Sequence, residues 1–216
     1  MLDNKALAAI RQEYTLKQFD ESHLNLDPMV QFQVWFKEAL AAEVMEPNAM
    51  SLATVKHDGK PSSRIVLLKG IDPSGFVFYT NYDSNKGKQL IENPEAALLF
   101  FWPELQRQVR IEGKIAKNSE SDSDEYFFSR PKESQIGAHA SPQSKPIPSR
   151  AILEENYRKF EGLFSTEPII RPLHWGGYIL VPDNLEFWQG RANRMHDRFL
   201  FTRTETLSWT YTRLAP

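Results

Sequence analysis

Short β-rich segments follow one another closely from Ala49 onward, and this succession limits the possible folds more than any other feature of the chain. The runs "AMSLATVK" and "SSRIVLLK" flank "HDGKP", in which the Asp58-Gly59 pair predicts a tight hairpin turn. The runs "GFVFYT", "EAALLFFW" and "QVRIEGKIA" follow, separated by turns or by the short helical segment "SNKGKQLIENP". Strands joined mainly by short links favour an antiparallel barrel or sandwich.

Helical patterns precede and interrupt these strands. Asp3 or Asn4 can cap a short helix in "DNKALAAIRQEYTL", and Asp27 followed by Pro28 begins a longer one in "DPMVQFQVWFKEALAAEV". Between about 119 and 165, "SDSDEYFFSR" and "RAILEENYRKFEGLF" have helical spacing, and a proline-rich loop lies between them. The β pattern then returns in "HWGGYILVP", "LEFWQG", "DRFLFTR" and "LSWTYTRL".

We therefore expect a mainly β protein with α decorations, of the α+β class. The expected organisation is one domain over residues 1–216, with an N-terminal helical lid at about 1–25 and a helical insertion at about 119–165. The chain contains neither internal repeats nor a linker long enough to divide it.

Composition excludes several classes of protein. The formal net charge of −2 argues against a general nucleic-acid binder, so any phosphate site must come from a local basic cluster. The chain has no cysteine, which excludes disulfides, thiolate nucleophiles and cysteine metal sites. The N-terminal residues lack an apolar signal core, and no run reaches membrane-spanning length. We therefore expect a cytoplasmic protein without a membrane partner.

Common catalytic signatures are missing: the sequence has no GxGxxG, Walker A, HExxH or GxSxG motif. The five histidines are scattered without metal-ligand spacing, so we expect no metal. What remains is a set of basic residues within apolar strands.

The first basic pair is in "RIVLLKG", where Arg64 and Lys69 bracket four aliphatic residues. A buried strand with solvated charged ends explains this pattern, and so does an anion bound at the strand ends. Strand alternation places Arg64 and Lys69 on opposite faces, so the two side chains are expected to contact different groups.

Two further segments carry phosphate-binding residue types. In "FYTNYDSNKGKQ", Ser84 caps a helix start that contains Lys86, although many helices without a ligand begin this way. In "YFFSRPKESQIGA", Tyr126, Arg130 and Ser134 share one helical stripe if Pro131 permits continuity. A solvated helix face explains that stripe equally well.

Near the C-terminus, "RANRMHDRFLFTR" is rich in cationic groups. In an extended strand Arg194, His196 and Arg198 share one face, while Asp197 points the other way. This alternation argues against a His196–Asp197 acid–base couple. A solvent-exposed edge strand explains this pattern, and the preceding Trp188 makes a ligand wall more plausible.

Taken in order, these segments resemble the pyridoxine (pyridoxamine) 5′-phosphate oxidase family over nearly the whole chain. The strings "YFFSRPKESQIGA" and "FWQG…RMHDRF" are long and specific, and "RQEY", "RIVLLK", "FYTN", "QVRIEGK", "QS" and the terminal "RLAP" fit the same pattern. The resemblance implies an antiparallel split β-barrel of FMN-binding type and a homodimer with FMN at its interface. It also implies oxidation of pyridoxamine or pyridoxine 5′-phosphate to pyridoxal 5′-phosphate, with hydride passing to FMN and O₂ reoxidising the flavin to release H₂O₂, as part of vitamin B6 metabolism.

The resemblance also implies the roles of individual residues. The implied flavin contacts are Arg64, Ile65, Val66, Leu67, Leu68, Lys69, Tyr79, Thr80, Lys86, Gln108, Gln143, Ser144, Trp188 and Arg198. The implied substrate contacts are Arg11, Gln12, Glu13 and Tyr14 in the lid, Lys69, Tyr126, Arg130 and Ser134 around the phosphate, and Arg194, Met195 and His196 over the ring. Arg194 and His196 are the implied catalytic residues.

Asn85 departs from the family pattern, because an arginine is common at this place, and one contact to the FMN phosphate is therefore expected to be missing. Gln12 likewise stands where arginine is frequent. Two other functions stay open: a split-barrel flavin oxidoreductase with another substrate, such as a flavin reductase-like or haem-degrading relative, and a non-catalytic carrier of FMN or pyridoxal phosphate.

Overall fold

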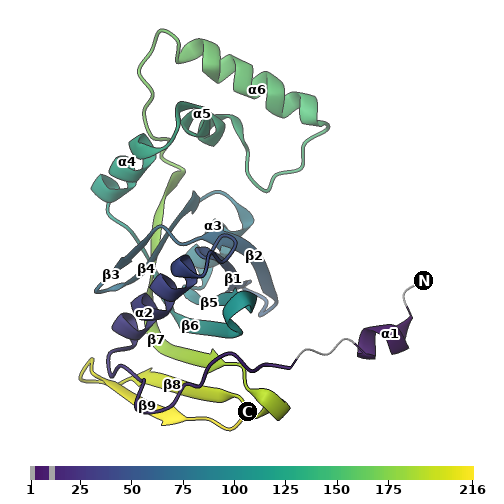
Figure 1. Ribbon diagram of the computed structural model, residues 1–216. Coiled ribbons are helices and arrows are strands. Elements are labelled where there is room, and N and C mark those ends of the chain that lie inside the picture. Colours follow the sequence, from purple (N-terminus) through teal and green to yellow (C-terminus); the bar gives the residue numbers. More distant parts are fainter. Residues whose placement is uncertain (1–2, 10–12) are drawn as a thin grey trace. The chain divides into compact units, whose positions relative to one another are not determined.

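The computed structural model describes residues 3–9 and 13–216 (Figure 1). The helices are α1 (Asn4–Ala9), α2 (Pro28–Ala41), α3 (Asn85–Glu92), α4 (Glu120–Ser129), α5 (Lys132–Ala140) and α6 (Arg150–Leu163), with 3₁₀ turns η1 (Pro103–Leu105) and η2 (Ala192–Arg194). The strands are β1 (Ala49–Val55), β2 (Pro61–Leu67), β3 (Gly70–Asp72), β4 (Gly75–Asn81), β5 (Glu95–Trp102), β6 (Arg107–Lys117), β7 (Trp175–Gln189), β8 (Asp197–Arg203) and β9 (Trp209–Arg213).

These strands form one sheet in the order β2-β1-β5-β6-β7-β4-β3, and β8 joins β7 and then β9. The pairs β1–β2, β3–β4, β4–β7, β7–β8 and β8–β9 are all antiparallel. Most neighbours along the chain are joined by short turns, as the spacing of the β-rich segments predicts. The predicted turn at Asp58-Gly59 closes the β1–β2 hairpin, and Gly59 has a φ of 80°, which suits glycine.

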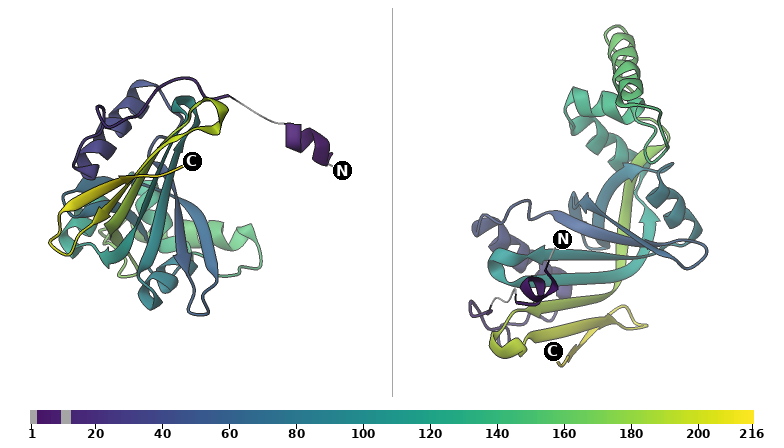
Figure 2. Two further views of the ribbon diagram at one scale, coloured as in Figure 1. Left: turned by 90° about the horizontal axis from the view of Figure 1, so that it is seen from below. Right: turned by 90° about the vertical axis from the view of Figure 1, so that its right-hand side faces the viewer.

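The chain divides into two compact units, which are described separately. The first unit comprises the described residues of Met1–Pro47, Leu99–Ile111 and Asp183–Pro216. Its core lies between α2 and strand residues of β5, β7 and β8: Phe32 meets Phe100 edge-on, and Trp35 meets Phe187 in the same way. The β8–β9 hairpin, yellow in Figures 1 and 2, extends this part of the sheet.

Helix α2 begins as its sequence predicts. The Asp27 side chain accepts a hydrogen bond from the Met29 N–H at 2.8 Å, and Pro28 occupies the first turn, where its missing N–H costs nothing. The buried face of the helix carries Phe32 and Trp35, whereas Leu40 is 55% exposed.

The second unit comprises Asn48–Leu98 and Glu112–Pro182. It holds the β1–β2 hairpin, β3, β4, α3 and the helical insertion α4–α6. Helix α6 packs on α5, where the Asn156 side chain donates to the Ala140 carbonyl and His139 lies against Phe160 and Phe164. Figures 1 and 2 show α6 lying across α5.

Two expectations about the elements are wrong. The predicted strands "HWGGYILVP" and "LEFWQG" are one strand, β7, because Pro182 falls between the residues that pair with β4 and those that pair with β8. Pro182 lies outside both paired stretches, so neither β4 nor β8 needs a hydrogen bond from an N–H at this position. The described part of the first helix is α1, and Glu13 and Tyr14 at the end of the predicted stretch are not helical.

Candidate active site

In the second unit, the guanidinium of Arg64 is held in a fixed position by neutral groups. Its Nη1 donates to the Leu52 carbonyl at 3.1 Å and to the Thr54 hydroxyl at 2.7 Å. Its Nη2 donates to the Ser62 hydroxyl at 2.9 Å and to Gln89 Oε1 at 3.2 Å. Four neutral acceptors orient this cation without neutralising it.

Lys86 lies beside this arginine at the start of α3. Ser84 caps the helix as predicted, accepting from the Gly87 N–H at 3.2 Å. The Lys86 ammonium donates to Gln143 Oε1 at 2.9 Å and to the Thr80 hydroxyl at 3.3 Å. Three predicted flavin contacts from β4, α3 and the loop after α5 therefore meet in one place.

We call Arg64, Thr80, Lys86 and Gln143 the cation cluster. Among the described residues, neither Arg64 nor Lys86 forms an ion pair with a carboxylate. Burial lowers the pKa of Lys86, and the charge of Arg64 lowers it further. Burial also lowers the pKa of Arg64. Two partly buried cations without a counter-charge fit a dianionic phosphate group such as that of FMN.

The other predicted residues of this strand lie on both of its faces. Arg64 and Val66 are half-buried, whereas Ile65 and Leu67 on the opposite face are exposed, and Leu68 beyond the strand is buried. Lys69 follows the strand, and its N–H donates to the Val77 carbonyl.

Lys69 borders a cavity of about 380 Å³ in the same unit. Tyr79 and Tyr126 also line it, so three residues predicted to contact the flavin or the substrate phosphate share this cavity. Acidic side chains border it as well, namely Asp72, Asp122 and Glu125. Arg64 does not line it, as expected from the opposite orientations of Arg64 and Lys69 in the strand pattern.

Arg130 and Ser134 are not on one continuous helix with Tyr126. Helix α4 ends at Ser129, and both Arg130 (ψ 152°) and Pro131 (ψ 144°) are extended before α5 begins. The proline ring disfavours a helical conformation in the preceding residue, which breaks the predicted stripe. Arg130 still reaches across the break, and its Nη2 donates to the Ser134 carbonyl at 2.9 Å.

The second nitrogen of that guanidinium is more informative. Arg130 Nη1 is buried and has no hydrogen-bond partner within the part of the chain that the structure describes. A buried donor without an acceptor is costly, and an anionic ligand would satisfy it. Neither Arg130 nor Ser134 lines the cavity beside Lys69.

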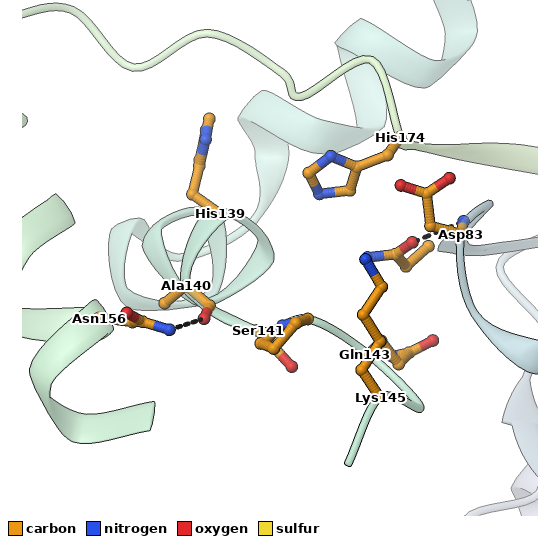
Figure 3. A pocket seen from close by; sticks show the side chains of 10 residues that line it. Asp83, His139, Ala140, Ser141, Gln143, Lys145, Asn156 and His174 are labelled. Atoms are coloured by element: carbon orange, nitrogen blue, oxygen red, sulfur yellow. Dashed lines mark hydrogen bonds between the residues drawn. The ribbon is translucent and has the colours of Figure 1, made fainter. Parts of the chain in front are cut away.

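A second cavity of about 260 Å³ lies in the same unit between α5, α6 and the loop after α5 (Figure 3). Gln143 of the cation cluster lines it, together with Asp83, His174 and Lys145. The His139 side chain turns away from Gln143 in Figure 3, because its Nε2 donates to the Ile170 carbonyl at 2.8 Å. Ser144, which follows Gln143, is exposed and has a φ of 68°.

In the first unit, Trp188 and Arg198 lie directly opposite each other on β7 and β8. The Arg198 Nε donates to Glu186 Oε1 at 2.7 Å, and its Nη1 donates to the Ala215 carbonyl at 2.9 Å. Glu186 is 2% exposed and also pairs with Arg110 at 2.8 Å. Sequence reasoning did not single out Glu186, although a lone acid within the apolar run "NLEFW" is an unusual signal.

Gln108 is half-buried on β6, two residues before Arg110. The two-residue period of a strand therefore gives Gln108 the same face as Arg110. That face is the one from which Arg110 reaches Glu186.

The segment from Arg194 to Arg198 is not one extended strand, contrary to expectation. Residues Ala192–Arg194 form the turn η2, with Asn193 at φ 54° and Arg194 at φ 60°. Strand β8 begins only at Asp197, so the period of two does not apply to Arg194. A left-handed arginine is strained and is therefore of functional interest. Arg194 and Met195 are both exposed.

His196 is fixed by its own loop. Its Nδ1 accepts from the backbone N–H of Arg191 at 3.1 Å. Burial lowers the pKa of His196, and the charges of Arg194 and Arg198 lower it further. The ring is therefore neutral at pH 7 with its proton on Nε2, which makes this atom a hydrogen-bond donor. Trp188 lies against the ring, with centroids 4.5 Å apart.

Within the described part of the chain, Asp197 forms its hydrogen bonds with groups other than this ring. Its carboxylate accepts from Arg191 at 2.8 Å, from Arg213 at 3.0 Å and from the Phe19 N–H at 3.2 Å. A His196–Asp197 acid–base couple is therefore absent from this geometry.

Tyr14 covers this part of the first unit. Its ring lies edge-on to Trp188 at 5.8 Å and to His196 at 5.9 Å. Gly190 leaves the necessary room, since a Cβ there would lie 2.8 Å from Tyr14 Cγ. Glu13 is exposed, and the predicted lid residues Arg11 and Gln12 lie outside the described residues.

The residues that the structure describes contain neither a membrane-spanning helix nor a metal-binding group of side chains. No helix among them is long and apolar enough to cross a membrane. No three histidine or acidic side chains among them gather into a group that could hold a metal ion.

Comparison with known proteins connects both units to one family. A sequence model described as pyridoxamine 5′-phosphate oxidase matches residues 36–164, and one described as the pyridoxine 5′-phosphate oxidase C-terminal dimerisation region matches residues 175–216. Proteins named pyridoxine/pyridoxamine 5′-phosphate oxidase from Burkholderia mallei and Burkholderia thailandensis are 56% identical to this chain over 212 residues, which cover 97% of this chain and 99% of each relative.

Solved structures give the same fold. PhzG from Burkholderia lata, in complex with tetrahydrophenazine-1-carboxylic acid, has a TM-score of 0.87 and 32% identity, covering 94% of this chain and 99% of its own. A pyridoxamine 5′-phosphate oxidase-related, FMN-binding protein from Nostoc punctiforme has a TM-score of 0.70 and 18% identity, covering 89% and 100%. The expected antiparallel split β-barrel with helices is confirmed.

Proposed function

The chain belongs to the pyridoxine/pyridoxamine 5′-phosphate oxidase family, and we propose that it oxidises pyridoxamine and pyridoxine 5′-phosphate to pyridoxal 5′-phosphate. The observation that carries this function is the 56% identity over 97% of the chain to relatives named for that reaction. When bound, FMN supplies the two-electron oxidation, and O₂ regenerates it with release of H₂O₂. The protein's own part is to bind, orient and shield the reactants.

The cation cluster is the part of the chain suited to the FMN phosphate. Lys86 and Arg64 supply two charges without a carboxylate partner, and Thr80 and Gln143 supply polar atoms beside them. Trp188 and Arg198 are the proposed flavin contacts from the first unit, with Arg198 oriented by Glu186. The remaining flavin contacts implied by the resemblance stay predictions.

The substrate phosphate is proposed to bind Lys69, Tyr126, Arg130 and Ser134. The free Nη1 of Arg130 supports this assignment, because it is a buried donor that a phosphate oxygen would satisfy. Binding the phosphate far from the reacting carbon fixes the position of the pyridine ring and lowers the entropic part of the barrier.

His196 and Arg194 are proposed to act on the substrate ring. The backbone bond to His196 Nδ1 keeps the proton on Nε2, so this histidine donates a hydrogen bond rather than removing a proton. Arg194 is proposed to orient the substrate over the flavin and to stabilise the charge that develops as the hydride leaves. The edge of Tyr14 against His196 excludes water from the ring.

The assembly is proposed to be a homodimer with FMN at the subunit interface. The matched C-terminal dimerisation region, residues 175–216, supports the dimer. We also place the protein in the cytoplasm, because a chain of 216 residues without cysteine suits a reducing compartment.

An oxidase assay tests this function directly. The purified protein should be yellow, and with pyridoxamine or pyridoxine 5′-phosphate it should release H₂O₂ in equal amount to pyridoxal 5′-phosphate. Binding of FMN without H₂O₂ production would instead favour another substrate, and a reduced phenazine carboxylic acid is the natural second choice because of the likeness to PhzG. A colourless protein that binds no FMN would refute both flavin functions.

A further inference from the structure

Trp175, which the site prediction did not include, lies under the residues assigned to the substrate phosphate. It opens β7 and is 7% exposed. Its ring is nearly parallel to that of Tyr126, at 7° and with centroids 6.1 Å apart. The Arg130 guanidinium carbon lies 4.6 Å from the centroid of the same indole. One side chain thus contacts two of the four proposed phosphate ligands.

A third ring completes this packing. Tyr79 stacks on Tyr126 at 3.9 Å and 19°, and on Trp175 at 5.6 Å and 11°. Gly177 makes this possible, because a Cβ at that position would lie 2.9 Å from both the Tyr79 ring and the Asn118 side chain. Phe127 meets the indole edge-on at 5.2 Å. The end of α4 therefore rests on one aromatic surface.

Trp175 is itself held firmly in place. Its carbonyl accepts from Arg171 Nη1 at 2.7 Å, and Arg171 Nε pairs with Asp124 on α4 at 2.6 Å. Arg171 is 8% exposed. The indole and the helix that carries Tyr126 are thus joined by a second, polar link.

The helix break explains why such a support is needed. Arg130 is extended and follows the last residue of α4, so its side chain needs a restraint besides the hydrogen bond from its Nη2 to the Ser134 carbonyl. The indole face provides that restraint through a cation–π contact. It does so without accepting a hydrogen bond, which leaves Arg130 Nη1 free for an oxygen of the ligand.

We propose that Trp175 is a positioning residue for the substrate phosphate, holding the ring of Tyr126 and the guanidinium of Arg130 in their binding arrangement. The inference rests on the proposed function, since it assumes that these two residues bind the phosphate of the substrate. Trp175 acts through them and does not contact the reacting atoms.

The test compares Trp175→Leu and Trp175→Phe with wild type in the FMN-loaded enzyme. We measure kcat and KM for pyridoxine 5′-phosphate and for pyridoxine, the competitive Ki of inorganic phosphate, and the Kd of FMN. For Trp175→Leu we expect KM for the phosphorylated substrate and Ki to rise about tenfold, roughly 1.4 kcal/mol. The kcat, the FMN Kd and kcat/KM for pyridoxine should stay within about twofold. Trp175→Phe keeps an aromatic face and should lie between the two.

Trp209→Leu is the matched control, because Trp209 also lies under an arginine, Arg203, at 5.9 Å, but on β9, which carries no proposed site residue. It should leave Ki unchanged. An unchanged Ki in Trp175→Leu would overturn the inference, and so would an equal loss with pyridoxine and its phosphate, since that marks a general structural role. If Trp175→Leu does not fold, Trp175→Phe decides by the same two criteria.

Different results refute the proposed function and the role of Trp175. A wild-type enzyme that releases no H₂O₂ refutes the proposed function, whereas an active wild type with an unaffected Trp175→Leu variant refutes only the role of Trp175. In the first case, binding of pyridoxal 5′-phosphate, followed by its absorbance, still tests whether Trp175→Leu weakens phosphate recognition.

Discussion

Replacing Glu186 with glutamine removes one buried negative charge that pairs with two arginines. Glu186 is 2% exposed, and it pairs with Arg198 at 2.7 Å and with Arg110 at 2.8 Å. Glutamine keeps the volume and one carbonyl oxygen, so the change tests the charge and not the packing. Because the carboxylate is fully enclosed, its ion pairs differ from those on the surface.

The exposure of the partners sets the size of the effect. A fully buried charge that loses its partner costs about 3–5 kcal/mol, whereas an exposed pair is worth about 0–1 kcal/mol. The side chains of Arg198 and Arg110 are 25% and 42% exposed, so water takes over part of the lost interaction. We expect a loss of about 2 kcal/mol, which lowers Tm by roughly 4–8 °C in a chain of this size.

Differential scanning calorimetry with and without saturating FMN measures this change. The control is Glu154→Gln, which removes an exposed helical pair with Arg150 and should lower Tm by less than about 2 °C. If Arg198 contacts the flavin, Glu186→Gln should also weaken FMN binding. A Tm within about 1 °C of wild type, or an equal fall in the control, would refute the reasoning.

Three further changes test other parts of the site. Lys86→Met should raise the FMN Kd roughly 10- to 100-fold, as measured by fluorescence titration. The Tm of the apo protein should equal or exceed that of wild type, because the change removes a like charge beside Arg64. Arg194→Ala should lower kcat/KM by about 100-fold without changing the FMN Kd, with Asn193→Gly as the control for backbone strain; full turnover at an unchanged KM would show the assigned role to be wrong. Burial holds the pKa of His139 below its ordinary value of 6.5, so the unfolded chain binds more protons than the native protein as pH falls below 6.5, and stability should fall there. In His139→Gln, the urea midpoint of unfolding should depend less steeply on pH between pH 8 and 5.5. A pH dependence as steep as that of wild type would contradict the role assigned to His139.

Features determined by neighbouring residues were predictable from sequence. The Asp27–Pro28 helix start, the Ser84 cap and the turn at Asp58-Gly59 each depend on a few consecutive residues whose backbone preferences agree.

Features determined by distant residues were not predictable in this way. The left-handed Asn193 and Arg194 end the strand pattern early, and nothing in the local residue types requires this conformation. Trp175 contacts Tyr126, which lies 49 positions earlier in the chain, so no periodicity of the sequence relates them. The family resemblance gave the proposed members of the site, and the structure adds which neighbours contact them.

The carboxylate of Asp197 also has a consequence for the order of folding. It accepts from the Phe19 N–H across 178 positions of the chain, and the neighbouring Arg213–Glu21 pair spans 192. Loops of this length close slowly, because their ends must meet before any contact compensates the lost chain entropy. Phe19 nevertheless ends in the core, 3% exposed against Trp35 and Phe199.

The segment that carries Tyr14 is therefore expected to dock last during refolding and to leave first when the protein opens locally. Nascent chains would complete the β8–β9 hairpin before Phe19 finds its place, so the covering of His196 by Tyr14 is among the final events of maturation. Hydrogen exchange should then show the Phe19 amide opening at a lower free energy than the amides of β8.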